Sequence, residues 1–99
     1  MPKAGGYIYI LASGIGGTLY IGVTSNLAGR IYQHKSGTVE GFTTAYQVNR
    51  LVYYELYDSI EAAILRERQV KKWNRAWKIA LIEKRNPNWI DLYPQIAAP

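Results

Sequence analysis

Residues 7–24 read YIYILASGIGGTLYIGVT, and they carry the clearest structural pattern in the chain. Residues 7–12 and 18–24 are rich in β-branched and aromatic side chains, which favour β-strands. The five residues between them include three glycines, which take positive φ angles without steric cost. The pattern therefore predicts a β-hairpin.

The two faces of this hairpin carry different side chains, because alternate residues of a strand point to opposite sides. One face is aliphatic and suits packing on a helix; it holds Ile8, Ile10, Ile21 and Val23. The other face is aromatic and holds Tyr7, Tyr9 and Tyr20. On that face Gly22 leaves space beside Tyr20 for a ligand or another backbone to approach. The alternative interpretation is that the tyrosines fill a second small core.

The rest of the chain predicts one more strand and three helices. The expected helices cover residues 27–36, 59–73 and 76–84, and the expected strand covers residues 50–57. Asp58, followed by Glu61 three residues later, fits a capping box that opens the second helix. Residues 38–49 show no period and are expected to be a loop. The order ββαβαα predicts a single α+β domain over residues 1–99, with helices packed on a small antiparallel sheet.

Composition excludes several classes of protein. The 99 residues suffice for one domain with a small core. The absence of cysteine excludes disulfides, thiol catalysis and cysteine-based metal sites. The first residues lack the features of a signal peptide, and no apolar run is long enough to span a membrane. We therefore expect a cytoplasmic domain with no membrane association.

Positive charge is concentrated in one part of the chain. Twelve Lys and Arg residues against seven Asp and Glu give a formal net charge of +5. Residues 66–85 alone contain eight basic and two acidic side chains. Such a segment attracts phosphate backbones or other anionic surfaces. The alternative is an ordinary solvated helix face in a mildly basic protein.

The first predicted helix places two polar side chains at the border between core and hairpin. Leu27, Arg30, Ile31 and His34 recur every three or four residues and form one stripe. Leu27 and Ile31 would anchor the helix to the sheet. Arg30 would then be placed to grip a phosphate and His34 to relay a proton. The alternatives are a surface charge and a structural histidine.

The long helix places a carboxylate on its apolar stripe. Glu67 follows Ile60 by seven residues, so it should face the interior. A buried carboxylate is costly without a cation, a donor network or a metal. A structural ion pair with a neighbouring Lys or Arg and a metal site both remain open.

Taken together, these residues resemble the GIY-YIG nuclease superfamily. Tyr7-Ile8-Tyr9 stands at the first motif, with tyrosine in place of its glycine, and Tyr20-Ile21-Gly22 matches the second motif in full. Arg30 and His34 match the helix motif, and Glu67 matches the metal-binding glutamate. The likeness covers about residues 5–93 and is closest to the small stand-alone members.

The resemblance implies a three-stranded antiparallel sheet flanked by helices and a metal-dependent DNA endonuclease. Glu67 would hold one Mg²⁺ or Mn²⁺, and Arg30 would stabilise charge on the phosphate. Tyr20 would position or deprotonate the attacking water, supported by Tyr9 and His34. Because a phenol is a weak base at neutral pH unless cations such as Lys35 lower its pKa, the choice of base among these three stays open. The late asparagine of the family has two candidates here, Asn74 and Asn86.

No separate DNA-binding domain fits in this chain, so the nuclease face itself, DNA structure, a protein partner or a homodimer must supply specificity. Basic side chains interleaved with tryptophan suit a phosphate backbone and an unpaired base, which favours single-stranded, branched or flapped DNA. The residues expected to contact DNA are Lys35, Arg68, Lys71, Lys72, Trp73, Arg75, Trp77 and Lys78. The alternatives are a catalytically weak nucleic-acid-binding module on the same scaffold and a small basic interaction protein whose aromatic faces dimerise.

Overall fold

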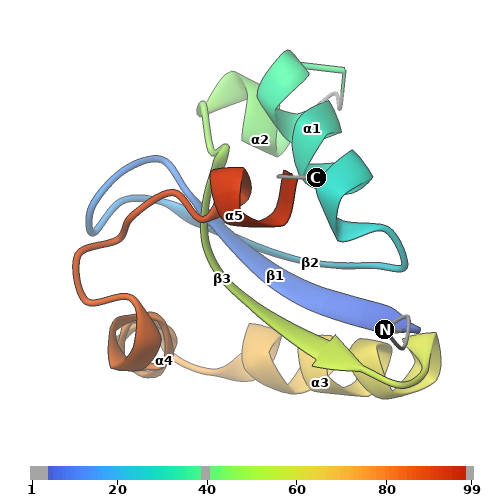
Figure 1. Ribbon diagram of the computed structural model, residues 1–99. Coiled ribbons are helices and arrows are strands. Elements are labelled where there is room, and N and C mark those ends of the chain that lie inside the picture. The colour runs from blue at the N-terminus through green and yellow to red at the C-terminus, as the bar shows by residue number, and fades with distance from the viewer. Residues whose placement is uncertain (1–4, 39–40, 98–99) are drawn as a thin grey trace.

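The computed structural model describes residues 5–38 and 41–97, which form three strands and five helices (Figure 1). The strands are β1 (Gly6–Ala12), β2 (Leu19–Thr24) and β3 (Arg50–Tyr57). The helices are α1 (Leu27–Ser36), α2 (Phe42–Ala45), α3 (Ile60–Lys72), α4 (Arg75–Arg85) and α5 (Tyr93–Ala97).

The strands make one antiparallel sheet in the order β2-β1-β3. The hairpin predicted from residues 7–24 is therefore confirmed, and β3 pairs with the other side of β1. In this register Tyr9 lies opposite Gly22 on β2 and opposite Tyr54 on β3. The α+β architecture is confirmed as well. Because β1 is the central strand, β2 forms one edge of the sheet. Side chains from the two faces of the sheet can therefore meet around the outer side of β2.

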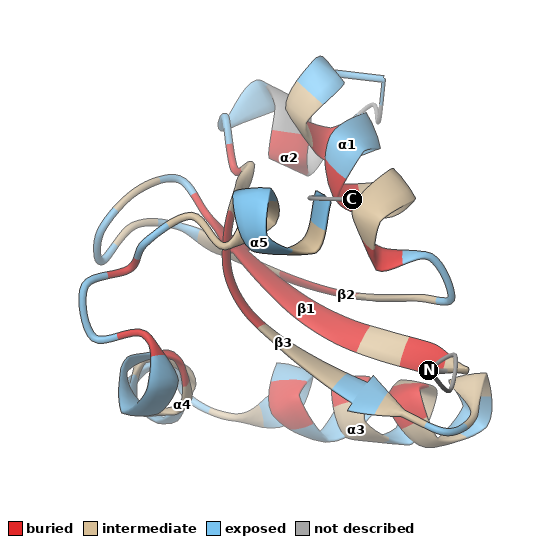
Figure 2. Ribbon diagram, viewed as in Figure 1, coloured by how far each residue is buried: buried red, intermediate tan, exposed pale blue. Residues whose placement is uncertain are grey.

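Each face of the sheet buries its own hydrophobic cluster, so the tyrosine face does hold the second small core considered as the alternative. Figure 2 shows that most of central β1 is buried. Ile8, Ile10 and Ile21 are buried on the face covered by α3 and α4. Tyr9 is buried on the opposite face with Leu27 and Ile31, the two residues expected to anchor α1. Helices α1 and α5 lie side by side over this second face. Hence α1 and α3, which carry the expected site residues, lie on opposite sides of the sheet.

Two short helices extend the predicted order. The segment expected to be a loop contains α2, and the chain end contains α5, whose Ile96 packs against the tyrosine-side cluster. Residues 39 and 40 of the expected loop lie outside the described residues. Helices of four and five residues are too short to show a periodic pattern, so the sequence carried no signal for them.

The cap of α3 also differs from the prediction. Ser59, not Asp58, is the N-cap, and its hydroxyl accepts a hydrogen bond from the Ala62 backbone N–H. Both residue types are good caps, and either assignment fits the spacing. The predicted end of α1 is confirmed, because Gly37 adopts a left-handed conformation with φ of 76°. Within the described part of the chain, no helix combines the length and apolar character needed to cross a membrane.

Candidate active site

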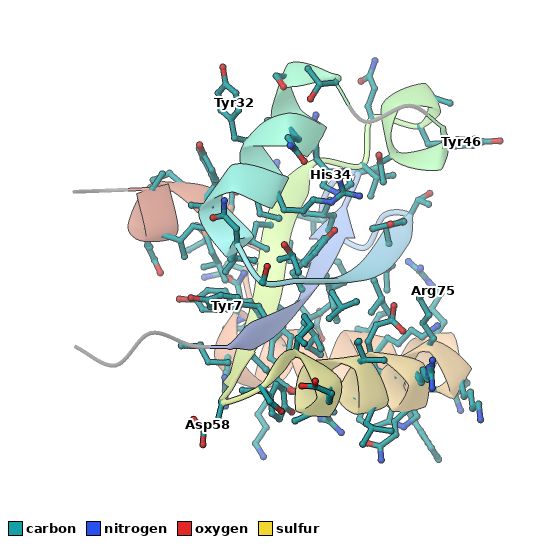
Figure 3. The ribbon with its side chains drawn as sticks, turned by 90° about the vertical axis from the view of Figure 1, so that its right-hand side faces the viewer. Tyr7, Tyr32, His34, Tyr46, Asp58 and Arg75 are labelled. Atoms are coloured by element: carbon teal, nitrogen blue, oxygen red, sulfur yellow. The ribbon has the colours of Figure 1, made fainter. Side chains whose placement is uncertain are left out.

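Three aromatic rings from β1, β2 and α1 meet on the tyrosine face of the sheet. The ring centroids of Tyr20 and His34 are 5.5 Å apart, those of Tyr9 and His34 are 5.8 Å apart, and those of Tyr9 and Tyr20 are 6.3 Å apart. Figure 3 shows His34 under α1 and facing the strands. The structure thus brings together three of the predicted site residues from segments distant in sequence.

A chain of hydrogen bonds runs through this ring cluster, defined as Tyr9, Tyr20 and His34. The Tyr9 hydroxyl lies 3.1 Å from His34 Nε2, and His34 Nδ1 lies 3.1 Å from the Thr43 hydroxyl. Both Tyr9 and His34 are buried, with 1% and 3% of their surface exposed. A neutral imidazole donates through one nitrogen and accepts through the other, so the three groups fix one another's orientation.

Gly22 makes room for the ring cluster. A Cβ atom on Gly22 would lie 2.3 Å from both Cζ and the hydroxyl oxygen of Tyr9, which is far inside contact distance. The space beside Tyr20 that we expected for a ligand or another backbone is therefore filled by the Tyr9 phenol itself. The glycine is required for the close approach of a tyrosine on the neighbouring strand.

Arg30 lies beside the buried phenol on the same stripe of α1. The pKa of Arg30 is raised, chiefly by hydrogen bonding to Tyr9 and to a smaller extent by Tyr20. One guanidinium nitrogen also donates to the Gln33 side chain at 3.2 Å. Arg30 is half-buried, so its charge is held at the rim of the cluster and remains reachable by a phosphate.

The protonation states of the cluster follow from burial. Burial and the charge of Arg30 lower the pKa of His34 to about 4, so its imidazole is neutral at pH 7. Burial also raises the pKa of Tyr9 above 10, and the hydrogen bond from Arg30 opposes that shift only in part. Tyr9 is therefore a protonated phenol at neutral pH. Tyr20 is the more exposed of the two tyrosines.

Glu67 lies on the inward side of α3, as the periodicity predicted, with 9% of its surface exposed. Its Oε2 forms an ion pair with Nζ of Lys71, which lies one helical turn further along, at a distance of 2.9 Å. The structural partner considered from the sequence is thus present. Glu67 approaches the site from the opposite face, and its effect on the pKa of Tyr9 is the weakest of the identified influences.

The donor set around Glu67 matches one class of cation. No group of three or more His, Cys, Asp and Glu side chains gathers anywhere in residues 5–38 and 41–97. A cation held by a single carboxylate must take its remaining ligands from water and substrate. Mg²⁺ is commonly held in this way, by one or two carboxylates with several waters and phosphate oxygens. Glu67 therefore fits Mg²⁺ or the similar Mn²⁺.

Four of the residues expected to contact DNA are engaged within the protein. Lys35 forms an ion pair with Asp91 and lies over the Tyr93 ring, and the cation that shifts the pKa values of Tyr9 and His34 is Arg30. Arg75 donates to the backbone oxygens of Gly16 and Gly17 in the hairpin loop, both at 2.7 Å. The other two are Lys71, paired with Glu67, and Trp73, whose ring packs between Arg66 and Trp77.

The other four differ in how much of their surface they expose. Arg68, Lys72 and Trp77 are exposed, and Lys78 is half-buried. Trp77 has 59% of its surface exposed although its ring contacts Trp73 edge-on, with centroids 6.0 Å apart. The basic segment 66–85 thus divides into side chains that hold the fold together and side chains open to a partner.

The sequence analysis did not predict the roles that two residues, Thr43 and Lys71, have in the site. Thr43 is buried and orients His34, but it sits in α2, where no pattern predicted structure. Lys71 was expected on DNA and instead neutralises Glu67. The spacing of four residues on a helix was the available signal for this pair. For Thr43 the sequence offered none.

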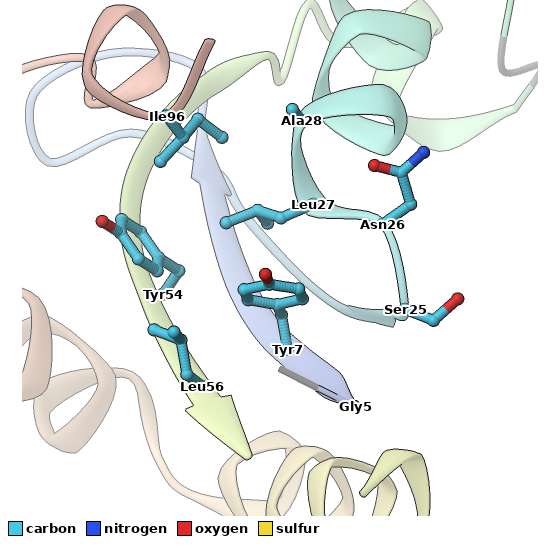
Figure 4. A pocket seen from close by; sticks show the side chains of 9 residues that line it. All are labelled: Gly5, Tyr7, Ser25, Asn26, Leu27, Ala28, Tyr54, Leu56 and Ile96. Carbon is cyan, nitrogen blue, oxygen red and sulfur yellow. The ribbon is translucent and has the colours of Figure 1, made fainter. Parts of the chain in front are cut away.

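A large groove lies elsewhere on the tyrosine face. It has a volume of about 780 Å³ and is bordered by the start of α1, the end of β3 and α5, with Tyr7, Tyr54 and Leu56 among its lining residues (Figure 4). None of the candidate catalytic residues lines it.

An antiparallel sheet with tyrosines on adjacent strands, an arginine and histidine on the following helix and an inward glutamate on a later helix defines one class of domain. The family model described as the GIY-YIG catalytic domain matches residues 5–80. The chain belongs to the GIY-YIG family, which is a nuclease superfamily.

Within this family the chain is similar to a group called UPF0213 proteins. It is 40% identical to one from Syntrophus aciditrophicus over 82% of this chain and 92% of the relative. It is 36% identical to one from Natronomonas pharaonis over 77% and 88% of the two chains. The solution NMR structure of a UPF0213 protein from Bacillus halodurans is 30% identical, has a TM-score of 0.54, and is matched over 87% of this chain and 90% of that one.

Proposed function

We propose that the protein is a divalent-metal-dependent DNA endonuclease that hydrolyses phosphodiester bonds. Membership of a nuclease superfamily supports the reaction class. The observation that carries the proposal is the almost fully buried carboxylate of Glu67, held on the stripe of α3 that faces the sheet. A carboxylate kept there at the cost of desolvation is suited to recruiting a cation.

Glu67 would hold one Mg²⁺ or Mn²⁺. When bound, the ion supplies positive charge that polarises the scissile phosphate and stabilises the leaving oxygen. Arg30 binds a non-bridging phosphate oxygen from the α1 side and stabilises the charge that develops in the transition state. The Arg30 guanidinium would approach from one face of the sheet and the metal ion at Glu67 from the other. The scissile phosphate would thus lie between them at the β2 edge.

Among the three candidate bases, Tyr20 is the group best placed to orient or deprotonate the attacking water. Tyr9 and His34 are buried and bonded to each other, whereas Tyr20 is half-buried beside them. Tyr9, His34 and Thr43 act as positioning residues that hold the Tyr20 ring and Arg30 in place. Tyr20 can take a proton from the water as its own hydroxyl proton passes to solvent, because that phenol is open to solvent.

We propose single-stranded, branched or flapped DNA as the substrate. Trp77 exposes a ring on which an unpaired base can stack, and the exposed Arg68 and Lys72 lie on the helix preceding it. Paired bases in a long duplex cannot reach a ring in this way without being unstacked.

The experiment is a cleavage assay with end-labelled single-stranded, duplex and flapped oligonucleotides, in Mg²⁺, in Mn²⁺ and in EDTA. We expect cuts that need the metal, that are fastest on single strands or flaps, and that disappear in Arg30→Ala. Equal cutting of plain duplex would refute the substrate preference. Undiminished cutting in EDTA would refute the metal dependence.

The same experiment decides the alternative of a nucleic-acid-binding module. That protein would shift the oligonucleotides in a gel and cut none of them in either metal. Because phosphate contacts weaken steeply as salt rises, the shift should be lost between low and moderate salt.

A further inference from the structure

Glu67 and Lys71 form an ion pair between groups in very different surroundings. The Glu67 side chain is 12% exposed, whereas the Lys71 side chain is 54% exposed. The two atoms, Oε2 and Nζ, lie 2.9 Å apart, and the residues are one turn apart on α3. The buried partner is fixed by the fold, whereas the exposed partner reaches it from outside.

The ion pair neutralises the charge of the buried Glu67 carboxylate in the metal-free protein. A carboxylate this deeply buried is costly if no positive charge faces it. The other ion pairs of α3 and of the neighbouring strand do not serve Glu67, because Arg66 is committed to Glu55 through two hydrogen bonds. Lys71 is the cation in contact with Glu67 within the described residues.

A divalent cation and the Lys71 ammonium cannot share this carboxylate at little cost. Two positive charges within about 4 Å repel by several kcal/mol at the effective dielectric of a protein surface. Lysine has a long flexible stem, and more than half of this one already contacts water. Lys71 can therefore swing outward into solvent while Glu67 stays in place.

We propose that Lys71 and the divalent cation occupy the Glu67 carboxylate in turn, so that Lys71 sets the affinity of the protein for its metal. This inference rests on the proposed function, because it takes Glu67 as the metal ligand. Lys71 holds the carboxylate in the metal-free protein and gives way when the cation arrives. The displaced ammonium then stands beside the metal site, where a DNA phosphate provides a new partner for it.

The test measures the dissociation constant of Mn²⁺ by isothermal titration calorimetry, without DNA and without turnover. Lys71→Met should bind Mn²⁺ about 3- to 10-fold more tightly than the unmodified protein, because no ion pair has to be broken. Lys71→Arg keeps a cation at the same position and should bind as weakly as the unmodified protein or more weakly. Thermal unfolding in EDTA checks that each variant is folded.

Lys72→Met is the matched control, since it removes an equal charge from the adjacent, exposed position of the same helix. It should leave the Mn²⁺ affinity within twofold of the unmodified protein. The proposal is overturned if Lys71→Met binds no more tightly, or if both variants tighten equally, which would indicate a long-range charge effect alone.

Glu67→Gln separates this inference from the proposed function. If Mn²⁺ binding survives in Glu67→Gln, the metal is held elsewhere and the exchange is wrong. If binding requires Glu67 but ignores Lys71, the exchange alone is wrong and the metal-dependent endonuclease stands. If the metal binds as expected but DNA is never cut, the exchange stands and the endonuclease fails.

Discussion

Gly22 lets two residues of adjacent strands meet at a distance that no other amino acid would permit. A Cβ atom there would lie 2.3 Å from the Tyr9 phenol, whereas a Cβ atom on Gly14, in the hairpin loop, would meet nothing within 4 Å. The two glycines lie close in sequence and differ in what surrounds them. The comparison isolates the packing of the phenol from the general effect of adding a methyl group.

Gly22→Ala should displace the Tyr9 ring and break its bond to His34. We expect unfolding free energy to fall by about 1–3 kcal/mol, the usual cost of overpacking a core. Cleavage should fall at least about tenfold, because small displacements of positioning groups are costly in catalysis. Urea unfolding and the cleavage rate are the measurements. Gly14→Ala should change neither, and equal effects of both variants would contradict the role assigned to Gly22.

His34 is the only histidine in the sequence, so it is the one side chain whose ordinary pKa lies between pH 5 and pH 7. Its pKa is lowered from 6.5 to about 4 by burial and by Arg30. Between these two pH values the unfolded chain binds a proton that the folded protein does not bind. Stability therefore rises with pH in this window and is lost as the pH falls from about 6.5 towards 4.

Urea midpoints measured between pH 7.5 and pH 4.5 test this linkage. The unmodified protein should lose stability steadily below pH 6.5, whereas His34→Gln, which has no imidazole to protonate, should lose much less. Parallel curves for the two proteins would show that His34 titrates normally. Acidic groups with lowered pKa values, such as Glu55 and Asp91, contribute below this range.

At the scale of elements, the buried Asn86 side chain helps to hold the segment after α4 against β3. The Asn86 amide donates to the backbone oxygens of Val52 and Ile90, and its oxygen accepts from the Ile90 N–H. Asn86 is buried at the end of α4, the helix that lies on the side of the sheet opposite the ring cluster. This candidate for the family's late asparagine therefore has a structural role, and Asn74 caps α4.

Asn86→Ala should cost about 2–3 kcal/mol of unfolding free energy, since buried backbone groups lose their partners. Asn88→Ala, two residues later and exposed, should cost almost nothing. Urea unfolding of both variants is the measurement. An unchanged midpoint for Asn86→Ala would show that water replaces the amide without penalty.

The sequence predicted those elements whose signal is local or periodic. The alternation of Ile8 and Tyr9 assigned both faces of β1, and the spacing of Leu27 and Ile31 assigned the buried side of α1. Contacts between distant positions had no such signal. The pair Lys35–Asp91 joins residues 56 positions apart, and the attachment of Arg75 to the hairpin loop is similarly remote.

The sequence predicted that Tyr9, Tyr20 and His34 belong together, but not how they are connected. The motif spacing identified Tyr9, Tyr20, His34 and Glu67. That Tyr9 fills the space above Gly22, and that His34 is buried and neutral, depends on how α1 packs on the sheet. The burial that sets these pKa values arises only from tertiary structure.

At the scale of the whole molecule, the excess positive charge is divided between α3 and α4. The two tryptophans near the junction of these helices, Trp73 at the end of α3 and Trp77 within α4, differ in role. Trp73 packs against Arg66 and Trp77, whereas Trp77 is largely exposed. If an unpaired base stacks on this surface, Trp77 is the residue that meets it. Trp73 supports the junction of the two helices.

Trp77→Ala should weaken binding to single-stranded DNA about tenfold, because stacking on an aromatic ring contributes about 1–3 kcal/mol per base. It should leave the salt dependence of binding unchanged, since no phosphate contact is removed. Fluorescence anisotropy with a labelled oligonucleotide at several salt concentrations measures both. Lys72→Ala is the control and should reduce the salt dependence instead. Unchanged affinity in Trp77→Ala would place the DNA on another surface.

We propose that the domain needs Glu67 to cleave DNA but not to bind it. The Glu67→Gln variant tests this directly. Binding and cleavage are measured on the same labelled flap oligonucleotide, in Ca²⁺ for binding and in Mn²⁺ for cleavage. We expect cleavage to fall at least about a thousandfold, as when a catalytic metal or electrostatic group is lost, while binding stays within a few-fold. Cleavage by Glu67→Gln at the rate of the unmodified protein would contradict the claim.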